Sequence, residues 1–206
     1  MHDAPRLFAR LEDAPWDRYD GLLFDCDGTL ADTMPLHYEA WAATLAPHRV
    51  LFPRDRYFSM AGMPTRAILE ALSAEQGIPL DFDALLPIKE NHFLARMGRV
   101  RAIEPVVAVA RAARGRTPIA VVSGGVRKAV ERTLETIGVH RWFCAIVTAE
   151  DTARGKPDPS PFLLAAERAG VDARRCLVFE DGGPGFESAR RAGMDAVDVR
   201  SSYEAI

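Results

Sequence analysis

The chain has 206 residues, an apolar share of 48% and a formal net charge of −3, with 26 Lys and Arg against 29 Asp and Glu. This length and apolar content predict one folded domain, or one domain with a smaller insert, and exclude intrinsic disorder. The nearly balanced charge provides no basic surface for nucleic acid or for an anionic membrane. We therefore expect neither as a partner.

The cysteines and the N-terminal residues indicate in which cellular compartment the protein is expected. Cys26, Cys144 and Cys176 are odd in number and widely separated, so they suggest neither a disulfide framework nor a structural zinc site. Charges and prolines interrupt the segment from Met1 to Asp20, which lacks the apolar core of a signal peptide, and no run of about 18 apolar residues occurs. We expect a cytoplasmic protein that is monomeric, with a dimer as the alternative.

Short apolar runs punctuate the chain. They are rich in Val, Ile, Leu and Phe without polar alternation, which is typical of strands buried on both faces of a parallel sheet. The runs are Gly21 to Cys26, Pro118 to Ser123, Phe143 to Thr148, Cys176 to Glu180 and Ala196 to Val199. Amphipathic stretches such as Asp158 to Ala169 and Gly183 to Ala192 lie between the last runs and predict crossover helices. The predicted class is α/β, with a doubly wound parallel sheet.

The interval between the first two runs is far longer than the dozen or so residues that a βαβ crossover needs. Prolines at first-turn positions predict helices over Pro35 to Leu45, Pro64 to Glu75 and Pro87 to Met97. Residues 33–100 are therefore expected to form an all-helical cap domain, inserted into a core domain of residues 1–32 and 101–206. Glu104 to Gly115 then returns to the core as a crossover helix.

Polar groups follow four of the predicted strands, where the carboxyl ends of parallel strands gather functional side chains. They are Asp25 and Asp27, Ser123 and Gly124, Lys156, and Glu180 with Asp181. Two carboxylates from one strand end and two from another can hold a hard divalent cation, and Mg²⁺ fits oxygen ligands best. We therefore predict Asp25, Asp27, Glu180 and Asp181 as metal ligands.

The same residues suit the hydrolysis of a phosphate monoester. Asp25 is the candidate nucleophile, and a cation together with Lys156 would offset its repulsion of a phosphate dianion. The Ser123 hydroxyl and the Gly124 amide would hold the remaining phosphate oxygens. Asp27 lies two residues further along an extended strand, on the same side, and can protonate the leaving alkoxide and later activate water.

Simpler interpretations apply to single motifs. Asp-Gly after an apolar run also suits an ordinary turn, and Asp-x-Asp also begins calcium loops. The calcium loop fails, because Thr29, Leu30 and Leu36 occupy the positions that need a ligand, a glycine and a glutamate. The joint appearance of the motifs at successive strand ends favours an active site.

Three residues of the predicted cap are candidates for substrate binding. His37 shares a helix face with Trp41, so it either packs, or contacts substrate or orients Asp27. Arg66 lies in a first helical turn, where the helix dipole disfavours a cation, so it either meets an anionic ligand or is an ordinary surface arginine. Lys89 either reaches the substrate or lies on a solvated helix face.

In order and spacing these motifs resemble those of the haloacid dehalogenase superfamily over nearly the whole chain. Asp25-Cys26-Asp27-Gly28-Thr29 resembles its first motif, Ser123 the second, Lys156 in Gly-Lys-Pro-Asp-Pro the third and Glu180-Asp181 the fourth. Leu30 to Thr33, His37, Trp41 and Gly62 to Arg66 are similar to the β-phosphoglucomutase-like branch, which includes sugar-phosphate phosphatases. The resemblance implies a Mg²⁺-dependent aspartyl-phosphate intermediate and a helical cap.

Two departures from that family pattern bear on function. Gly182 follows the fourth motif where many relatives have Ser or Ala, and Ala61 precedes Gly62 where mutases have a Lys. The missing cation favours a phosphatase, acting on small phosphorylated metabolites such as sugar phosphates, over a hexose phosphomutase. A catalytically silent sugar-phosphate-binding protein is a further alternative, but it would not need the complete set of acidic and basic groups.

Overall fold

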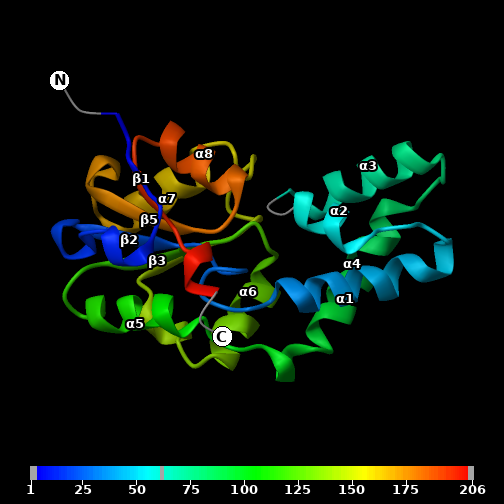
Figure 1. The fold of residues 1–206 in the computed structure, drawn as a ribbon, viewed down its shortest axis with the longest axis horizontal. Helices are drawn as coiled ribbons and strands as arrows, with labels where there is room; N and C mark the ends of the chain where they lie inside the picture. The colour runs from blue at the N-terminus through cyan, green and yellow to red at the C-terminus, as the bar shows by residue number, and fades with distance from the viewer. Residues whose placement is uncertain (1–3, 61–62, 204–206) are drawn as a thin grey trace.

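The computed structural model describes residues 4–60 and 63–203, which form a part built around a β-sheet and an all-helical part (Figure 1). The strands are β1 (Leu7–Phe8), β2 (Gly21–Phe24), β3 (Ile119–Val122), β4 (Ala145–Val147), β5 (Cys176–Glu180) and β6 (Asp195–Asp198). They form one six-stranded sheet in the order β1-β6-β5-β2-β3-β4, and every neighbouring pair is parallel. The predicted parallel α/β fold is confirmed.

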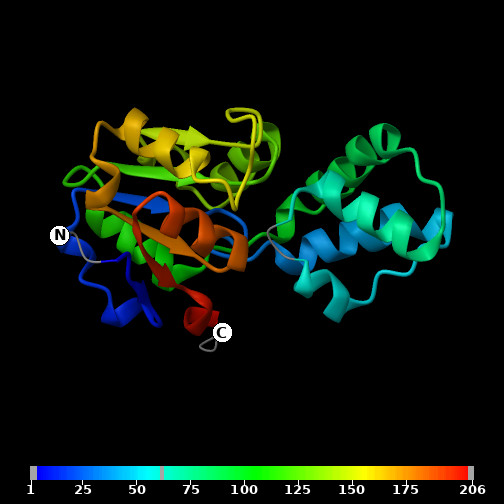
Figure 2. The same ribbon diagram turned by 90° about the horizontal axis from the view of Figure 1, so that it is seen from above.

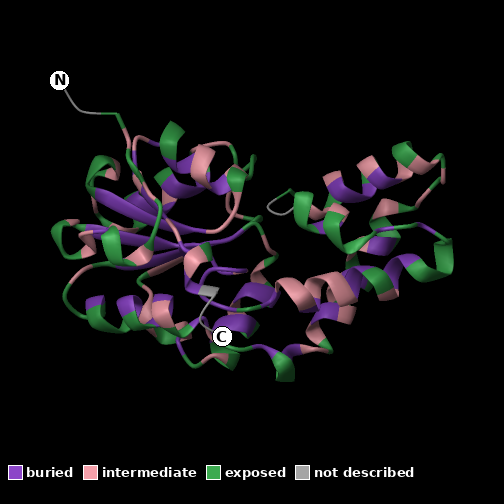
Figure 3. Ribbon diagram, in the orientation of Figure 1, coloured by how far each residue is buried: buried purple, intermediate pink, exposed green. Residues whose placement is uncertain are grey.

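Side chains alternate between the two faces of this sheet. In β2, Leu22 and Phe24 pack into the core on one face, and Leu23 packs into the core on the other. Phe24 lies opposite Phe179 of β5, and their stacked rings are 4.5 Å apart. The central strands β2, β3 and β5 are buried between two helical layers, as Figure 3 shows.

Two pairs of helices cover the sheet. Figures 1 and 2 show α5 (Glu104–Ala113) and α6 (Arg127–Thr136) on one face, and α7 (Ser160–Ala169) and α8 (Gly183–Arg191) on the other. Each pair contributes apolar residues to the core of its own face. The sheet is therefore doubly wound, and the carboxyl ends of its strands stay free for functional groups.

The helical part contains α1 (Met34–Leu45), α2 (Arg54–Ser59), α3 (Thr65–Gln76) and α4 (Phe82–Leu94), and stands beside the sheet (Figure 2). It has its own apolar core, which includes Trp41, Tyr57, Leu69, Leu72 and Leu85. Short 3-10 helices occur at Leu11–Asp13, Trp16–Arg18, Ala46–His48, Met97–Arg99, His140–Trp142, Ala173–Arg175 and Arg200–Tyr203.

The chain passes from the sheet to the helices and back through two adjacent segments. Ala31 and Ala102 form an antiparallel bridge, and the Asp32 N–H donates to the Arg101 carbonyl at 2.9 Å. A small apolar cluster at this junction includes Phe93 of the helical part. The helical part is therefore attached through one narrow connection.

Several predicted boundaries need correction. The helix expected from Pro87 begins at Phe82 and ends at Leu94, because the Asp81 side chain caps it by accepting from the Ala84 N–H, which leaves Pro87 inside. The strand expected from Phe143 begins at Ala145. Strand β1 and helix α2 were not predicted.

The lengths of the helices and the state of the cysteines bear on membrane insertion and on disulfide bonding. Within residues 4–60 and 63–203, no helix has the length and apolar character to cross a bilayer. Cys26, Cys144 and Cys176 are free thiols.

Candidate active site

A pocket of about 480 Å³ lies between the carboxyl ends of the strands and the helical part. It is lined by every predicted site residue: Asp25, Asp27, His37, Arg66, Lys89, Ser123, Gly124, Lys156, Glu180 and Asp181. The helical part adds an apolar wall, to which Trp41, Tyr57, Met60 and Ile68 belong. The two ends of the pocket thus have different character, one acidic and one largely apolar.

Lys156 fixes the position of Asp25 at the base of the pocket. Its ammonium group donates to Asp25 Oδ1 at 2.7 Å, to Glu180 Oε1 at 2.9 Å and to the Val122 carbonyl at 2.9 Å. These contacts use all of its protons. The two carboxylates, although distant in sequence, are therefore held together by one buried cation.

Asp25, Glu180 and Asp181 each offer an oxygen, and these oxygens all lie within 4.8 Å of one another. Burial raises the pKa of Asp25 to about 8 despite the opposing effect of Lys156, and Glu180 raises it further. Burial and the two neighbouring carboxylates likewise raise the pKa of Asp181. Such mutual repulsion among oxygen ligands is what a divalent cation relieves, so this group fits Mg²⁺. Asp27 lies outside the group.

Gly28 leaves room for the Asp181 carboxylate to approach the other two carboxylates of this group. Its φ is +84°, and a Cβ on this residue would lie 2.3 Å from Asp181 Oδ2. A larger residue would be strained and would displace the Asp181 carboxylate.

Asp27 is surrounded by hydrogen-bond donors. Its Oδ1 accepts from the Thr33 hydroxyl at 2.7 Å and lies 3.3 Å from His37 Nε2. Ser123 donates to Oδ2 at 3.4 Å, and its own hydroxyl oxygen accepts from the Gly125 N–H. Burial favours the neutral acid, but the contacts with His37 and Thr33 outweigh it and lower the pKa of Asp27 to about 2.

Lys89 is buried, so its interpretation as part of a solvated helix face is wrong. Its Nζ lies 3.0 Å from His37 Nδ1, and the His37 ring stacks on Phe93. Because an ammonium group only donates, His37 Nδ1 accepts and Nε2 carries the proton toward Asp27. Burial lowers the pKa of His37, and the positive charge of Lys89 lowers it further. The imidazole therefore stays neutral.

Arg66 lines the pocket but forms an ion pair with Asp83. The Asp83 carboxylate therefore provides the negative charge that offsets the unfavourable position of Arg66 in the first turn of α3. Gly124 also lines the pocket.

Sequence reasoning missed two residues of the site. Glu90 lines the pocket, and its Oε1 is buried without a hydrogen-bond partner among the residues described. Gly185 lies in α8, and a Cβ there would lie 1.5 Å from Glu180 Oε1. A glycine inside a predicted helix is unusual, so Gly185 could have been found from the sequence. No sequence pattern distinguishes Glu90.

Comparison with known proteins identifies the fold and its relatives. The family model for haloacid dehalogenase-like hydrolases matches residues 19–193. Fructose-1-phosphate phosphatase YqaB of Escherichia coli is 38% identical, over 90% of this chain and 98% of its own. A phosphorylated carbohydrates phosphatase of Thermotoga maritima is 27% identical, over 86% and 83%. The crystal structure of CbbY from Rhodobacter sphaeroides in complex with phosphate shares the fold, with a TM-score of 0.80, 24% identity and coverage of 88% and 86%.

The chain belongs to the haloacid dehalogenase-like hydrolases. Within this class it is a phosphatase, a hydrolase of phosphoric monoesters.

Proposed function

We propose that this chain is a Mg²⁺-dependent phosphatase of phosphorylated sugars that works through an aspartyl-phosphate on Asp25. The observation that carries the proposal is the pairing of Asp25, held by Lys156, with Asp27, held by Thr33 and His37, in one pocket. One carboxylate is positioned for attack and the other for proton transfer. The 38% identity to a fructose-1-phosphate phosphatase supports a sugar phosphate as the substrate.

The first half-reaction transfers the phosphoryl group to the protein. An Asp25 carboxylate oxygen forms a bond to phosphorus as the bond to the sugar oxygen breaks, and Asp27 gives its proton to the departing alkoxide. Asp27 is a carboxylate at rest; the approach of a phosphate dianion raises its pKa, and Asp27 takes up a proton from solvent before the bond to the sugar oxygen breaks. The charge of Lys156 beside Asp25 offsets the repulsion between that carboxylate and the phosphate dianion, and the Ser123 hydroxyl and the Gly124 amide hold the phosphate oxygens.

The second half-reaction returns the phosphoryl group to water. Asp27 accepts a proton from the water that attacks phosphorus, and the bond to Asp25 breaks. Asp25, Glu180 and Asp181 would hold Mg²⁺, and the ion would supply positive charge that offsets the repulsion between these carboxylates and the phosphate.

The helical part, residues 33–100, acts as the cap that recognises the leaving group. Trp41, Tyr57 and Glu90 line the pocket on the side of the cap, where the leaving group would lie. Lys89 contributes through His37, whose ring it orients.

Hydrolysis is favoured over phosphomutase activity because no cation among the described residues that line the pocket is unengaged and available for a second phosphate. Lys156 contacts carboxylates, Lys89 contacts His37 and Arg66 pairs with Asp83. Losing one charge-assisted phosphate contact costs about 1.5 to 3 kcal/mol. Ala61 and Gly62, on which the sequence argument rested, lie outside the described residues.

The test supplies fructose 1-phosphate and hexose 1-phosphates with Mg²⁺ and a trace of hexose bisphosphate. We expect free phosphate to appear without a 6-phosphate isomer, and a folded Asp25→Asn protein to release none. Isomer that forms faster than phosphate would establish a mutase. Binding of these esters without any turnover would establish a sugar-phosphate-binding protein.

A further inference from the structure

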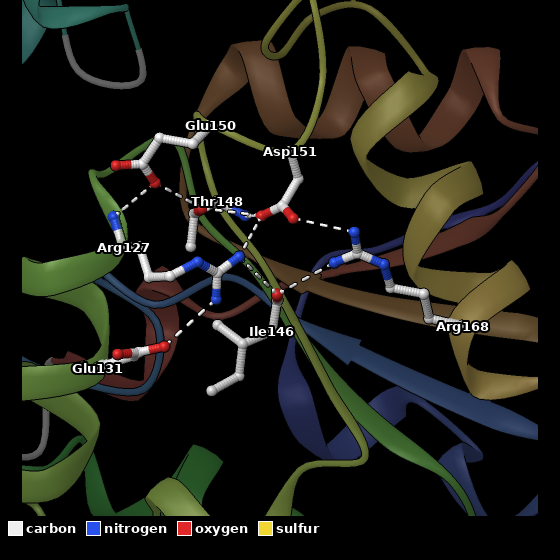
Figure 4. Close-up of polar contacts among 7 residues, drawn as sticks. All are labelled: Arg127, Glu131, Ile146, Thr148, Glu150, Asp151 and Arg168. Atoms are coloured by element: carbon white, nitrogen blue, oxygen red, sulfur yellow. Dashed lines mark hydrogen bonds and ion pairs between the residues drawn. The ribbon is translucent and has the colours of Figure 1, made fainter.

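The segment of residues 148–156, which connects β4 to α7, has two different faces. Thr148, Ala149, Thr152 and Ala153 line the active-site pocket, and Lys156 lies at the end of the segment. Glu150 and Asp151 contact α6 and α7 instead, as Figure 4 shows. The segment therefore links the pocket to a charged cluster outside it.

Asp151 is the centre of that cluster. Its Oδ2 accepts from the Thr148 N–H at 2.8 Å and from Arg127 at 2.5 Å, and its Oδ1 accepts from Arg168 at 2.9 Å (Figure 4). The Asp151 side chain is only 12% exposed. Although burial raises it, hydrogen bonds from Thr148 and Arg168 and the positive charge of Arg127 lower the pKa of this carboxyl to about 2.

Glu150 ties the same segment to the start of α6. Its Oε2 accepts from the Arg127 N–H at 2.8 Å, and the Thr148 hydroxyl lies 2.9 Å from this oxygen. The Ala149 N–H also donates to the Gly125 carbonyl at 3.1 Å. Gly125 directly follows Ser123 and Gly124, so the cluster joins the two backbone segments that carry the phosphate-binding groups.

The residues between Asp151 and Lys156 have only local side-chain support. Thr152 donates to the Arg154 carbonyl, and the 81%-exposed Arg154 side chain pairs with Asp158. Contacts of this kind hold a turn together but do not fix it against the sheet. Asp151 is thus the anchor that precedes Lys156 along the chain.

We infer that Asp151, held by Arg127 and Arg168, is a positioning residue that sets the distance between Lys156 and the Ser123–Gly125 segment. The inference rests on the proposed function, in which Lys156 supplies positive charge beside the phosphoryl group and the Ser123–Gly125 segment holds its oxygens. A misplacement of about 1 Å in such groups can lower a rate about 100-fold. An ordinary surface ion pair would instead contribute little, and Arg127 and Arg168 are 38% and 40% exposed.

The test is a double-mutant cycle on phosphate affinity, which is independent of turnover. Calorimetry measures the binding of inorganic phosphate, with Mg²⁺, to the wild type, Asp151→Asn, Lys156→Met and the double variant. We expect Asp151→Asn to weaken binding about tenfold in the wild-type background and less than about twofold in the Lys156→Met background. We also expect it to lower kcat about 10- to 100-fold.

Asp195→Asn is the matched control. Asp195 is also partly buried and accepts from the Tyr19 hydroxyl and the Arg6 N–H, but it lies on β6 and does not line the pocket. This variant should lose thermal stability while its phosphate affinity and kcat stay within about twofold of the wild type.

Two results would overturn the inference. One is a folded Asp151→Asn protein with wild-type phosphate affinity and kcat; the other is an equal loss of affinity in both backgrounds. Should Asp151→Asn not fold, Arg168→Gln removes one contact, and we expect about threefold weaker phosphate binding, with wild-type affinity as the contradicting result. A wild type that binds phosphate but hydrolyses no ester would refute the proposed function and leave the cycle valid.

Discussion

The two oxygens of the Asp27 carboxylate have different surroundings. Oδ1 accepts a hydrogen bond from the Thr33 hydroxyl and lies beside His37 Nε2, whereas Oδ2 accepts, among the described residues, only the longer hydrogen bond from the Ser123 hydroxyl. The pair of donors on Oδ1 fixes the rotation of the carboxylate. Oδ2 is therefore the atom expected to give and take the proton.

Replacing Asp27 with Asn should separate the two half-reactions. Turnover of an alkyl phosphate should fall by about 10²- to 10⁴-fold, because the alkoxide leaving group lacks its acid. An aryl phosphate, whose leaving group needs no proton, should still give a burst of about one equivalent of phenolate per protein, followed by slow turnover. Stopped-flow absorbance measures the burst. Alkyl phosphate turnover within tenfold of the wild type would exclude Asp27 as the acid.

Gly185 supports the site by giving the Glu180 side chain room. In Gly185→Ala the new Cβ would meet Glu180 Oε1, so Glu180 must move and Lys156 loses a partner. We expect a loss of about 1 to 3 kcal/mol in the free energy of unfolding, measured by urea denaturation, together with reduced turnover. Gly183→Ala, where a Cβ has open space, is the control. Equal behaviour of the two variants would contradict this role.

At the level of elements, the segment between β4 and α7 should make the free energy of unfolding depend on pH in the acid range. The pKa of Asp151 is about 2, below the unfolded value of about 3.9, so its contribution to stability is present above about pH 4 and disappears as the pH falls toward 2. Wild type should exceed Asp151→Asn by about 2 kcal/mol at pH 7, and this difference should shrink below pH 4. Urea denaturation across this range measures it. A difference that does not change with pH would contradict the assignment.

The elements of the sheet could be predicted well because buried parallel strands are continuous apolar runs. Strand β1 has only two residues, Leu7 and Phe8, which is too short for any periodicity. Helix α4 was misplaced because two start signals compete: Pro87 suits a first turn, but the Asp81 side chain provides the cap that the fold uses.

The residues of the candidate site also differ in how well the sequence predicts their positions. Asp25 and Asp27 adjoin a strand, so their convergence with Lys156 and Asp181 followed from sheet geometry alone. Lys89 looked solvated because its neighbours Glu90 and His92 are polar, yet it packs over Trp41 and Phe93. Only the packing of α1 against α4 reveals that environment, and sequence periodicity does not encode it.

For the molecule as a whole, metal binding should link activity with stability. Without a bound cation, the raised pKa of Asp25 means that the protonated carboxyl stabilises the fold fully below about pH 4, and that this contribution is lost as the pH rises through about 8. Mg²⁺ should therefore raise the melting temperature more at pH 8 than at pH 5. Differential scanning fluorimetry measures this shift.

The same samples test the requirement for the metal in catalysis. EDTA should abolish phosphate release, and excess Mg²⁺ should restore it. Full activity after the metal has been stripped, or a stabilisation by Mg²⁺ that is larger at pH 5, would contradict the acidic group as its site.

The order of the strands also determines at which point of synthesis the central part of the sheet can be completed. Strand β2 lies between β3 and β5, and Gly21 pairs with Cys176. Until the ribosome has added Cys176 and the residues after it, one edge of the apolar β2 has no neighbour, whereas α1 to α4 are already complete. Open strand edges pair with other chains. A nascent chain that lacks β5 therefore has an open apolar strand edge, and it also lacks Glu180 and Asp181 of the acidic group.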